Sequence, residues 1–184
     1  MDTLVLIGAS TGGPGHLKKI LSSLTKESKA IFIIVQHMNA SVMESFSSQL
    51  REHSMLSVSL VTGREELLAS TVYVCAHTLE LSIEHGRIYL NQSTKEAIYT
   101  PSINILFHSA LELLPKKKVI PILLTGIGDD GAEGTYQLHQ KGAYCIAESE
   151  ESAIVYGMPK KAYEINKEIK VMHLNKIIKF LQNV

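Results

Sequence analysis

Short, uninterrupted apolar runs are the clearest pattern along the chain. One leads up to Gly8, a second covers residues 30–36 and a third covers residues 119–125. A run without alternation of apolar and polar residues is typical of a strand that is buried on both faces, as in a parallel sheet covered by helices. The pattern therefore predicts a mostly parallel sheet with these three runs as central strands.

Segments with helical periodicity alternate with the apolar runs, which is the order of elements expected of an α/β fold. Two shorter runs, at residues 79–83 and 87–90, flank His85-Gly86, and we predict a small β-hairpin there because the glycine supplies a positive φ angle. The other predicted helices lie at residues 14–24, 40–51, 102–114, 131–140 and 176–182, and the other strands at residues 56–61, 73–76, 143–147 and 169–174. No repeat or linker divides the sequence.

A serine stands at the turn between the first predicted strand and the first predicted helix. The turn reads Gly8-Ala9-Ser10-Thr11-Gly12 and matches the G-x-S-x-G pattern of a nucleophile elbow, which exposes a serine beside helix N-terminal N–H groups. A dinucleotide-binding fingerprint fits badly, because Ser10 stands where the middle glycine must let a pyrophosphate approach. Taken alone, the turn favours a structural interpretation in which Ser10 caps the helix.

Polar residues that follow the other two central strands strengthen the nucleophile hypothesis. His37 comes directly after the second strand, and Asp130 follows the third. Because the carboxyl ends of parallel strands meet at one edge of a sheet, we predict that Ser10, His37 and Asp130 converge. In such a set the imidazole accepts the serine proton and the carboxylate orients the imidazole. The chain order Ser, His, Asp differs from that of α/β-hydrolases, and 184 residues is short for that fold.

The composition indicates one soluble domain. Hydrophobic residues make up 45% of the chain, and 18 basic residues balance 18 acidic ones, which argues against generic binding of nucleic acid. No apolar stretch approaches the roughly twenty residues needed to span a membrane, and Met1-Asp2 leads into a strand rather than a signal sequence. We expect a cytoplasmic protein in which Cys75 and Cys145 are reduced, buried thiols.

The polar residues outside the serine turn point to no cofactor and no metal. The eight histidines show neither H-x-H nor H-E-x-x-H spacing. Glu148, Glu150 and Glu151 form the densest acidic cluster, in a predicted loop after a strand. Such clusters are usually solvated, and we expect the same here; the alternative is that they repel or orient an acidic substrate.

Five ordered segments carry a family resemblance. They are residues 7–13, Gln36-His37-Met38, Pro101-Ser102 with residues 105–108, residues 124–132, and Tyr156-Gly157-Met158-Pro159. Together they resemble the catalytic domain of CheB, the chemotaxis receptor methylesterase family, over essentially the whole chain, so we expect residues 1–184 to form one such domain. The resemblance implies a doubly wound, three-layer α/β/α fold with a mostly parallel sheet.

The resemblance also implies roles for individual residues. Ser10 becomes the nucleophile and His37 the general base, and Asp130, rather than its neighbour Asp129, becomes the residue that orients His37. The implied activity is hydrolysis of glutamate methyl esters on the cytoplasmic helices of methyl-accepting chemoreceptors, with release of methanol and without a cofactor. Some relatives also deamidate receptor glutamines.

Two further expectations concern the oxyanion and regulation. Backbone N–H groups near Thr11 and Ile127 are the candidate donors to the oxyanion. Family enzymes usually carry an N-terminal receiver domain, whereas this chain begins at the catalytic strand. We therefore expect regulation to differ or to reside on another chain, with a separate receiver or methyltransferase protein as a partner.

Departures from the family pattern leave the substrate open. Thr100 and Asn104 stand where the family commonly has Arg and Asp, and Cys75-Ala76-His77 replaces the usual Ala-Pro-Gly. The triad is intact, but two alternatives remain at this point. One is a small-molecule esterase or amidase on the same scaffold, and the other is a catalytically inactive module that binds receptors.

Overall fold

A parallel sheet of seven strands forms the centre of the computed structural model, which describes residues 3–184. The strands are β1 (Thr3–Ala9), β2 (Ile31–Gln36), β3 (Ser57–Val61), β5 (Thr71–Cys75), β8 (Lys118–Leu123), β9 (Ile146–Glu148) and β10 (Lys170–Met172). Their order is β10-β9-β8-β1-β2-β5-β3, so the chain starts in the middle of the sheet and is wound outward in both directions. The predicted doubly wound α/β fold is confirmed.

The pairing of β1 decides where the loops of the site emerge. β1 pairs in parallel with β2, with Ala9 opposite Gln36, and in parallel with β8 on its other side. Ser10 and His37 are the next residues on their strands, and the loop that contains Asp130 follows β8. All three residues therefore follow strands that end at the same edge of the sheet.

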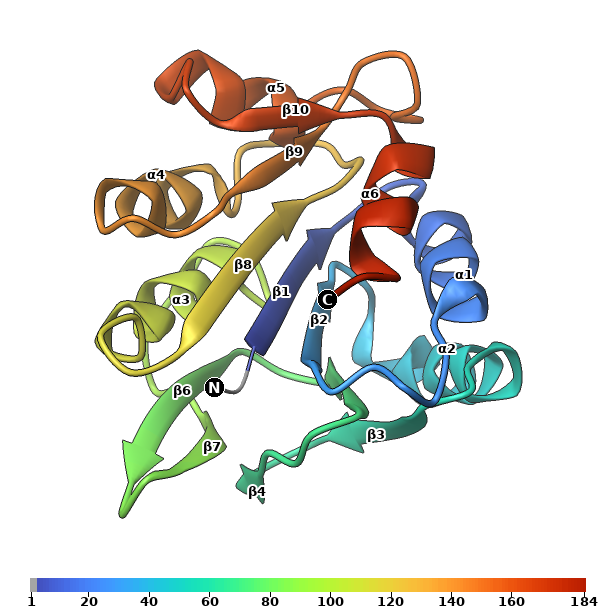
Figure 1. Cartoon of the computed structure of the whole chain (residues 1–184), viewed down its shortest axis with the longest axis vertical. Helices are drawn as coiled ribbons and strands as arrows, with labels where there is room; N and C mark the ends of the chain where they lie inside the picture. Colours follow the sequence, from blue (N-terminus) through green and yellow to red (C-terminus); the bar gives the residue numbers. More distant parts are fainter. Residues whose placement is uncertain (1–2) are drawn as a thin grey trace.

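Helices cover both faces of the sheet (Figure 1). They are α1 (Gly13–Ser23), α2 (Ala40–His53), α3 (Ile103–Ser109), α4 (Ala132–Gln140), α5 (Met158–Ile165) and α6 (Leu174–Leu181). Val5 and Ile7 of β1 belong to the apolar cluster with α1, α2 and α6, whereas Leu4 and Leu6 belong to the cluster with α3, α4 and α5. The continuous apolar run of β1 thus reflects burial on both faces. No helix among residues 3–184 has the length and apolar character needed to cross a membrane.

A small antiparallel sheet lies beside this core. The predicted hairpin is present as β6 (Leu79–Glu84) and β7 (Arg87–Gln92). His85 and Gly86 have φ angles of 51° and 82°, and positive φ at both residues is the geometry of a two-residue type I′ turn. A third strand, β4 (Glu65–Glu66), pairs with β7 and was not predicted, because two residues are too few to show an alternating pattern.

The helices differ from the predictions most clearly at α3, α5 and α6. The helix expected at residues 102–114 is an α-helix only to Ser109 and continues as a 3₁₀ turn at Ala110–Glu112. The last helix begins at Leu174 rather than at residue 176, because the His173 ring accepts a hydrogen bond from a backbone N–H of its first turn. Helix α5 was not predicted, since Pro159 and the two lysines after it interrupt its apolar pattern.

The burial of the sheet predicts that two isoleucines contribute very differently to the free energy of unfolding. Ile33 in β2 is fully buried, whereas Ile98 is 96% exposed. We expect Ile33→Ala to lower the free energy of unfolding by about 2–5 kcal/mol, because it opens a cavity in the core. The matched change Ile98→Ala should leave it nearly unaltered. Urea denaturation checks both variants, and equal midpoints would contradict the assigned burial.

Candidate active site

His37 and Asp130 form a short hydrogen bond at the carboxyl edge of the sheet. His37 Nε2 lies 2.7 Å from Asp130 Oδ2. The His37 side chain is 13% exposed, and Asp130 is buried. The backbone N–H of His37 also donates to the carbonyl of Ala9, at 2.9 Å, which holds His37 next to the end of β1. The structure thus brings two of the three predicted residues into direct contact.

The start of α3 holds the Asp130 carboxylate in place. The backbone N–H of Ile103 donates to Oδ2 at 2.7 Å, and the N–H of Asn104 donates to Oδ1 at 2.9 Å. The hydroxyl of Ser102, the N-cap residue of α3, lies 3.4 Å from Oδ1. These donors stabilise the ionised carboxylate and fix its orientation. Asp129, in contrast, is exposed and does not contact His37.

Ser10 lies in a tight turn that the surrounding backbone holds firmly. Its N–H donates to the carbonyl of Thr125 at 2.9 Å, and its own carbonyl accepts from the side-chain amide of Gln36, also at 2.9 Å. Gly12 follows with a φ of 86°, a left-handed conformation that favours glycine. A Cβ on Gly126 would lie 2.6 Å from the Cβ of Ser10, so the loop after β8 passes close to the serine because Gly126 has no side chain.

The interpretation that Ser10 caps helix α1 is wrong. The N-cap residue of α1 is Gly12, and no side chain caps that helix. Among residues 3–184, no group forms a hydrogen bond with Ser10 Oγ, and this includes His37. The hydroxyl therefore does no capping in this structure, and the prediction that Ser10 lies near His37 and Asp130 rests on the shared edge of the sheet.

The two candidate oxyanion donors belong to separate loops. Thr11 is exposed in the turn before α1, and Ile127 is exposed in the loop after β8. The neighbouring Gly126 N–H donates to the carbonyl of Val155 at 3.0 Å, and its carbonyl accepts from Met158 N–H at 2.9 Å. Within the described residues, neither Thr11 N–H nor Ile127 N–H has a backbone acceptor. Both groups can therefore donate to a ligand.

Tyr99 is a residue of the site that the sequence did not reveal. Its ring stacks on the imidazole of His37, with centroids 5.0 Å apart and an angle of 3° between the planes. Its hydroxyl donates to Asp129 Oδ1 at 3.3 Å. Tyr99 and Asp130 also border a cavity of about 450 Å³. Tyr99 stands in an irregular, largely exposed segment, so neither periodicity nor a motif distinguishes it.

The residues at the departures from the family pattern lie around α3. Thr100 is exposed. The side chain of Asn104 does not carry a charge to the site; its Oδ1 accepts from the N–H of Gly134 at 2.9 Å and so joins α3 to α4. Cys75 is a buried core residue. Among the described residues, no hydrogen bond joins any of these three side chains to His37.

The cysteines are free and buried, as predicted. Burial raises the pKa of the Cys145 thiol to about 12 and the pKa of the Cys75 thiol further. Both thiols are therefore protonated at neutral pH and are poor nucleophiles. In the part of the chain that the structure describes, no group of three or more His, Cys, Asp and Glu side chains is arranged to hold a metal ion.

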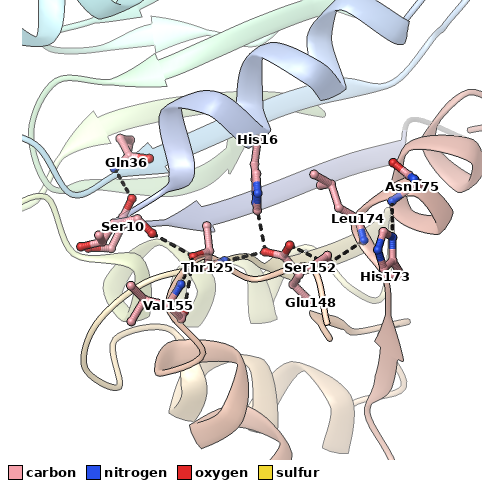
Figure 2. A network of polar contacts seen from close by, with 11 residues as sticks. Ser10, His16, Gln36, Thr125, Glu148, Ser152, Val155, His173, Leu174 and Asn175 are labelled. Atoms are coloured by element: carbon pink, nitrogen blue, oxygen red, sulfur yellow. Dashed lines mark hydrogen bonds and ion pairs between the residues drawn. The ribbon is translucent and has the colours of Figure 1, made fainter. Parts of the chain in front are cut away.

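The expectation for the acidic cluster is wrong for Glu148. Glu150 and Glu151 are exposed, as expected of a loop, but Glu148 is fully buried. Its carboxylate accepts a hydrogen bond from the backbone of Thr125 and lies beside His16 (Figure 2). This burial could not be predicted from the sequence, because these partners are distant along the chain.

Comparison with known proteins gives a consistent result. Residues 5–181 match the family model described as CheB methylesterase. A crystal structure of the CheB methylesterase catalytic domain from Thermotoga maritima superposes with a TM-score of 0.91 and 32% identity, covering 100% of this chain and 98% of that one.

Curated sequences are similar over a part of their length. The chain is 40% identical over 167 residues to "protein-glutamate methylesterase/protein-glutamine glutaminase 2" of Carboxydothermus hydrogenoformans, covering 88% of this chain and 47% of that protein. It is 38% identical over 183 residues to a protein of the same name from Vibrio vulnificus, covering 97% of this chain and 52% of that protein. The chain thus spans about half the length of the curated relatives it matches.

The stacked geometry of Tyr99 predicts a change in the nuclear magnetic resonance spectrum of His37. A ring stacked face to face shields the imidazole C–H protons. In Tyr99→Leu we expect these resonances to move to lower field, whereas Tyr99→Phe, which keeps the ring and loses the hydroxyl, should leave them close to their wild-type positions. A His37→Gln variant assigns the signals. Identical His37 resonances in Tyr99→Leu and wild type would show that the two rings do not stack.

Proposed function

Because the chain belongs to the CheB methylesterase family, we propose that it hydrolyses methyl esters of glutamate side chains, with Ser10 as the nucleophile. The observation that carries the proposal is the His37–Asp130 hydrogen bond at the edge of the sheet where Ser10 leaves β1. The proposal takes residues 1–184 as one catalytic domain.

The orientation of His37 assigns its two ring nitrogens. Nε2 donates its proton to the Asp130 carboxylate, so Nδ1 carries the lone pair that acts as the base. Ser10 Oγ attacks the ester carbonyl carbon while its proton passes to Nδ1. The tetrahedral intermediate then collapses, and the methoxide takes that proton and leaves as methanol. Water activated by His37 hydrolyses the acyl-serine to give the free carboxylate of glutamate.

The serine and histidine come within hydrogen-bond reach when substrate binds. Catalytic hydrogen bonds are often long or absent in unliganded enzymes and shorten in the complex. The Thr11 and Ile127 N–H groups donate to the negative oxygen of the tetrahedral intermediate. With glutamine as substrate, the same sequence of steps releases ammonia and gives glutamate.

Exposed apolar side chains next to Ser10 favour a protein substrate. Ile127 is 62% exposed and Ile154 is 66% exposed, and Ile154 packs over Gly12 in the nucleophile turn. Such residues can contact the surface of a helix from which a glutamate ester projects. The proposed partners are therefore the cytoplasmic helices of chemoreceptors. The proposed site of action is the cytoplasm, and a receiver or methyltransferase protein is the further partner that we propose.

Replacing the nucleophile tests the proposed reaction. We expect Ser10→Ala to lower kcat for methanol release from a methylated receptor fragment by about four to six orders of magnitude, because no other side chain replaces the attacking oxygen. Circular dichroism should show an unchanged fold, and binding of the fragment should persist. Wild-type turnover in Ser10→Ala would refute the proposal. Wild-type protein that hydrolyses small aryl esters but not the receptor fragment would instead support a small-molecule esterase.

Substitutions of the neighbouring residues Asp129 and Asp130 test which of the two orients His37. Asp130→Asn should lower kcat by about 10²–10⁴-fold, because the amide no longer stabilises the imidazolium of His37 and can select the wrong tautomer. Asp129→Asn should retain most activity, since Asp129 contacts the hydroxyl of Tyr99 rather than His37. Steady-state kinetics on the same substrate checks both variants. A larger loss in Asp129→Asn would mean that the roles of the two residues are reversed.

A further inference from the structure

A second histidine–carboxylate pair lies buried behind the nucleophile turn. His16 of α1 and Glu148 at the end of β9 are both buried, and His16 Nδ1 lies 3.2 Å from Glu148 Oε2. Neither residue takes part in the proposed reaction. A buried carboxylate is unfavourable unless hydrogen bonds replace its lost hydration. The contacts that replace it here are therefore informative.

Glu148 accepts hydrogen bonds from three segments of the chain (Figure 2). Its Oε2 accepts from the backbone N–H of Thr125 at 2.8 Å, and its Oε1 accepts from the hydroxyl of Ser152, also at 2.8 Å. The Ser152 oxygen in turn accepts from the N–H of Leu174, the first residue of α6, at 2.9 Å. Glu148 thereby joins α1, the end of β8 and the start of α6.

Thr125 links Glu148 to the turn that contains Ser10 by hydrogen bonds. It is fully buried, and its carbonyl accepts the N–H of Ser10 at 2.9 Å. Its hydroxyl donates to the carbonyl of Thr11 at 2.8 Å and accepts the N–H of Val155 at 2.9 Å. Two of its polar contacts thus hold the turn itself, on the residues proposed as nucleophile and oxyanion donor.

Through Val155, Thr125 is also linked to the loop that contains Ile127. The carbonyl of Val155 accepts the N–H of Gly126, at 3.0 Å, directly before Ile127. Both candidate oxyanion donors are therefore fixed relative to the same threonine. A displacement of Thr125 would move Ser10 and the donors, whereas the imidazole of His37 is oriented by its hydrogen bond to Asp130.

We propose that Thr125, anchored by the buried Glu148–His16 pair, is a positioning residue that sets the place of Ser10 and its oxyanion donors relative to His37. This inference rests on the proposed function, because it needs Ser10 to be the nucleophile. A misplacement of about 1 Å costs on the order of 10²-fold in rate. The effect should fall on kcat, since Thr125 is buried and does not contact substrate.

The test compares threonine variants on a peptide that carries a glutamate γ-methyl ester. Thr125→Val keeps the shape of the side chain and removes its hydroxyl, Thr125→Ser restores the hydroxyl, and Glu148→Gln removes the buried charge. The matched control is Thr135→Val, because Thr135 is also buried and its hydroxyl donates to a backbone carbonyl, that of Gly131 at 2.6 Å. Ser10→Ala is measured alongside, and kcat, KM and the melting temperature are recorded for each variant.

We expect Thr125→Val to lower kcat about 100-fold with KM changed by less than about twofold, and Thr125→Ser to recover most of the loss. Glu148→Gln should lower kcat by a smaller factor. Thr135→Val should keep the wild-type kcat even if its melting temperature falls as far as that of Thr125→Val. This pattern separates positioning from a general loss of stability.

Each other outcome overturns the proposal. Folded Thr125→Val and Glu148→Gln with wild-type kcat would show that the network does not position the serine. If neither can be obtained folded, the network secures the fold rather than the reaction. If Ser10→Ala retains turnover, the proposed function fails and the inference fails with it; if Ser10→Ala is inactive while the Thr125 variants are unaffected, only the positioning role fails.

Discussion

Backbone hydrogen bonds between β1 and its two parallel neighbours, β2 and β8, bring three chain segments out at one edge of the sheet. Side chains of β1 are buried in apolar clusters on both faces, and a shift in register by one residue would exchange those faces. The register of this pairing is therefore strongly specified. It also fixes the positions of Ser10 and His37 relative to each other along the strands. The chemistry of the site depends on this pairing more than on any single side-chain contact.

Two buried carboxylates then fix the loops that the sheet brings together. Asp130 accepts hydrogen bonds from backbone N–H groups at the start of α3 and holds His37, which is partly exposed. Glu148 accepts the N–H of Thr125 and lies against His16, which is buried. Both carboxylates are compensated by hydrogen-bond donors and paired with an imidazole. The first pair lies at the proposed active site, and the second is linked through Thr125 to the backbone of the proposed nucleophile.

The sequence predicted the parts of the molecule that depend on local pattern. Continuous apolar runs identified the central strands, and His85-Gly86 identified the hairpin turn. Strand-end position alone was enough to predict that His37 and Asp130 would meet. These inferences succeed because burial on two faces, turn geometry and the common edge of a parallel sheet each leave a signature in a few consecutive residues.

The parts that depend on distant contacts were not predictable in the same way. Glu148 reads as a solvated loop residue, since the groups that compensate its burial come from α1, from the loop after β8 and from the loop between β9 and α5. Tyr99 reads as part of an irregular segment until the fold stacks it on His37. No hydrogen bond joins the side chains of Ser10 and His37 in the described residues; strand pairing fixes the backbone positions of the two residues, and catalytic hydrogen bonds are often long in unliganded enzymes.

Covalent labelling tests the central claim most directly, namely that Ser10 is a nucleophile activated by His37. An activated serine displaces fluoride from an alkyl fluorophosphonate and forms a stable phosphonate ester, and peptide mapping by mass spectrometry locates the adduct. We predict a single adduct on Ser10 that forms far more slowly in a His37→Ala variant. An adduct on another residue, or labelling of Ser10 at the same rate without His37, would contradict the account.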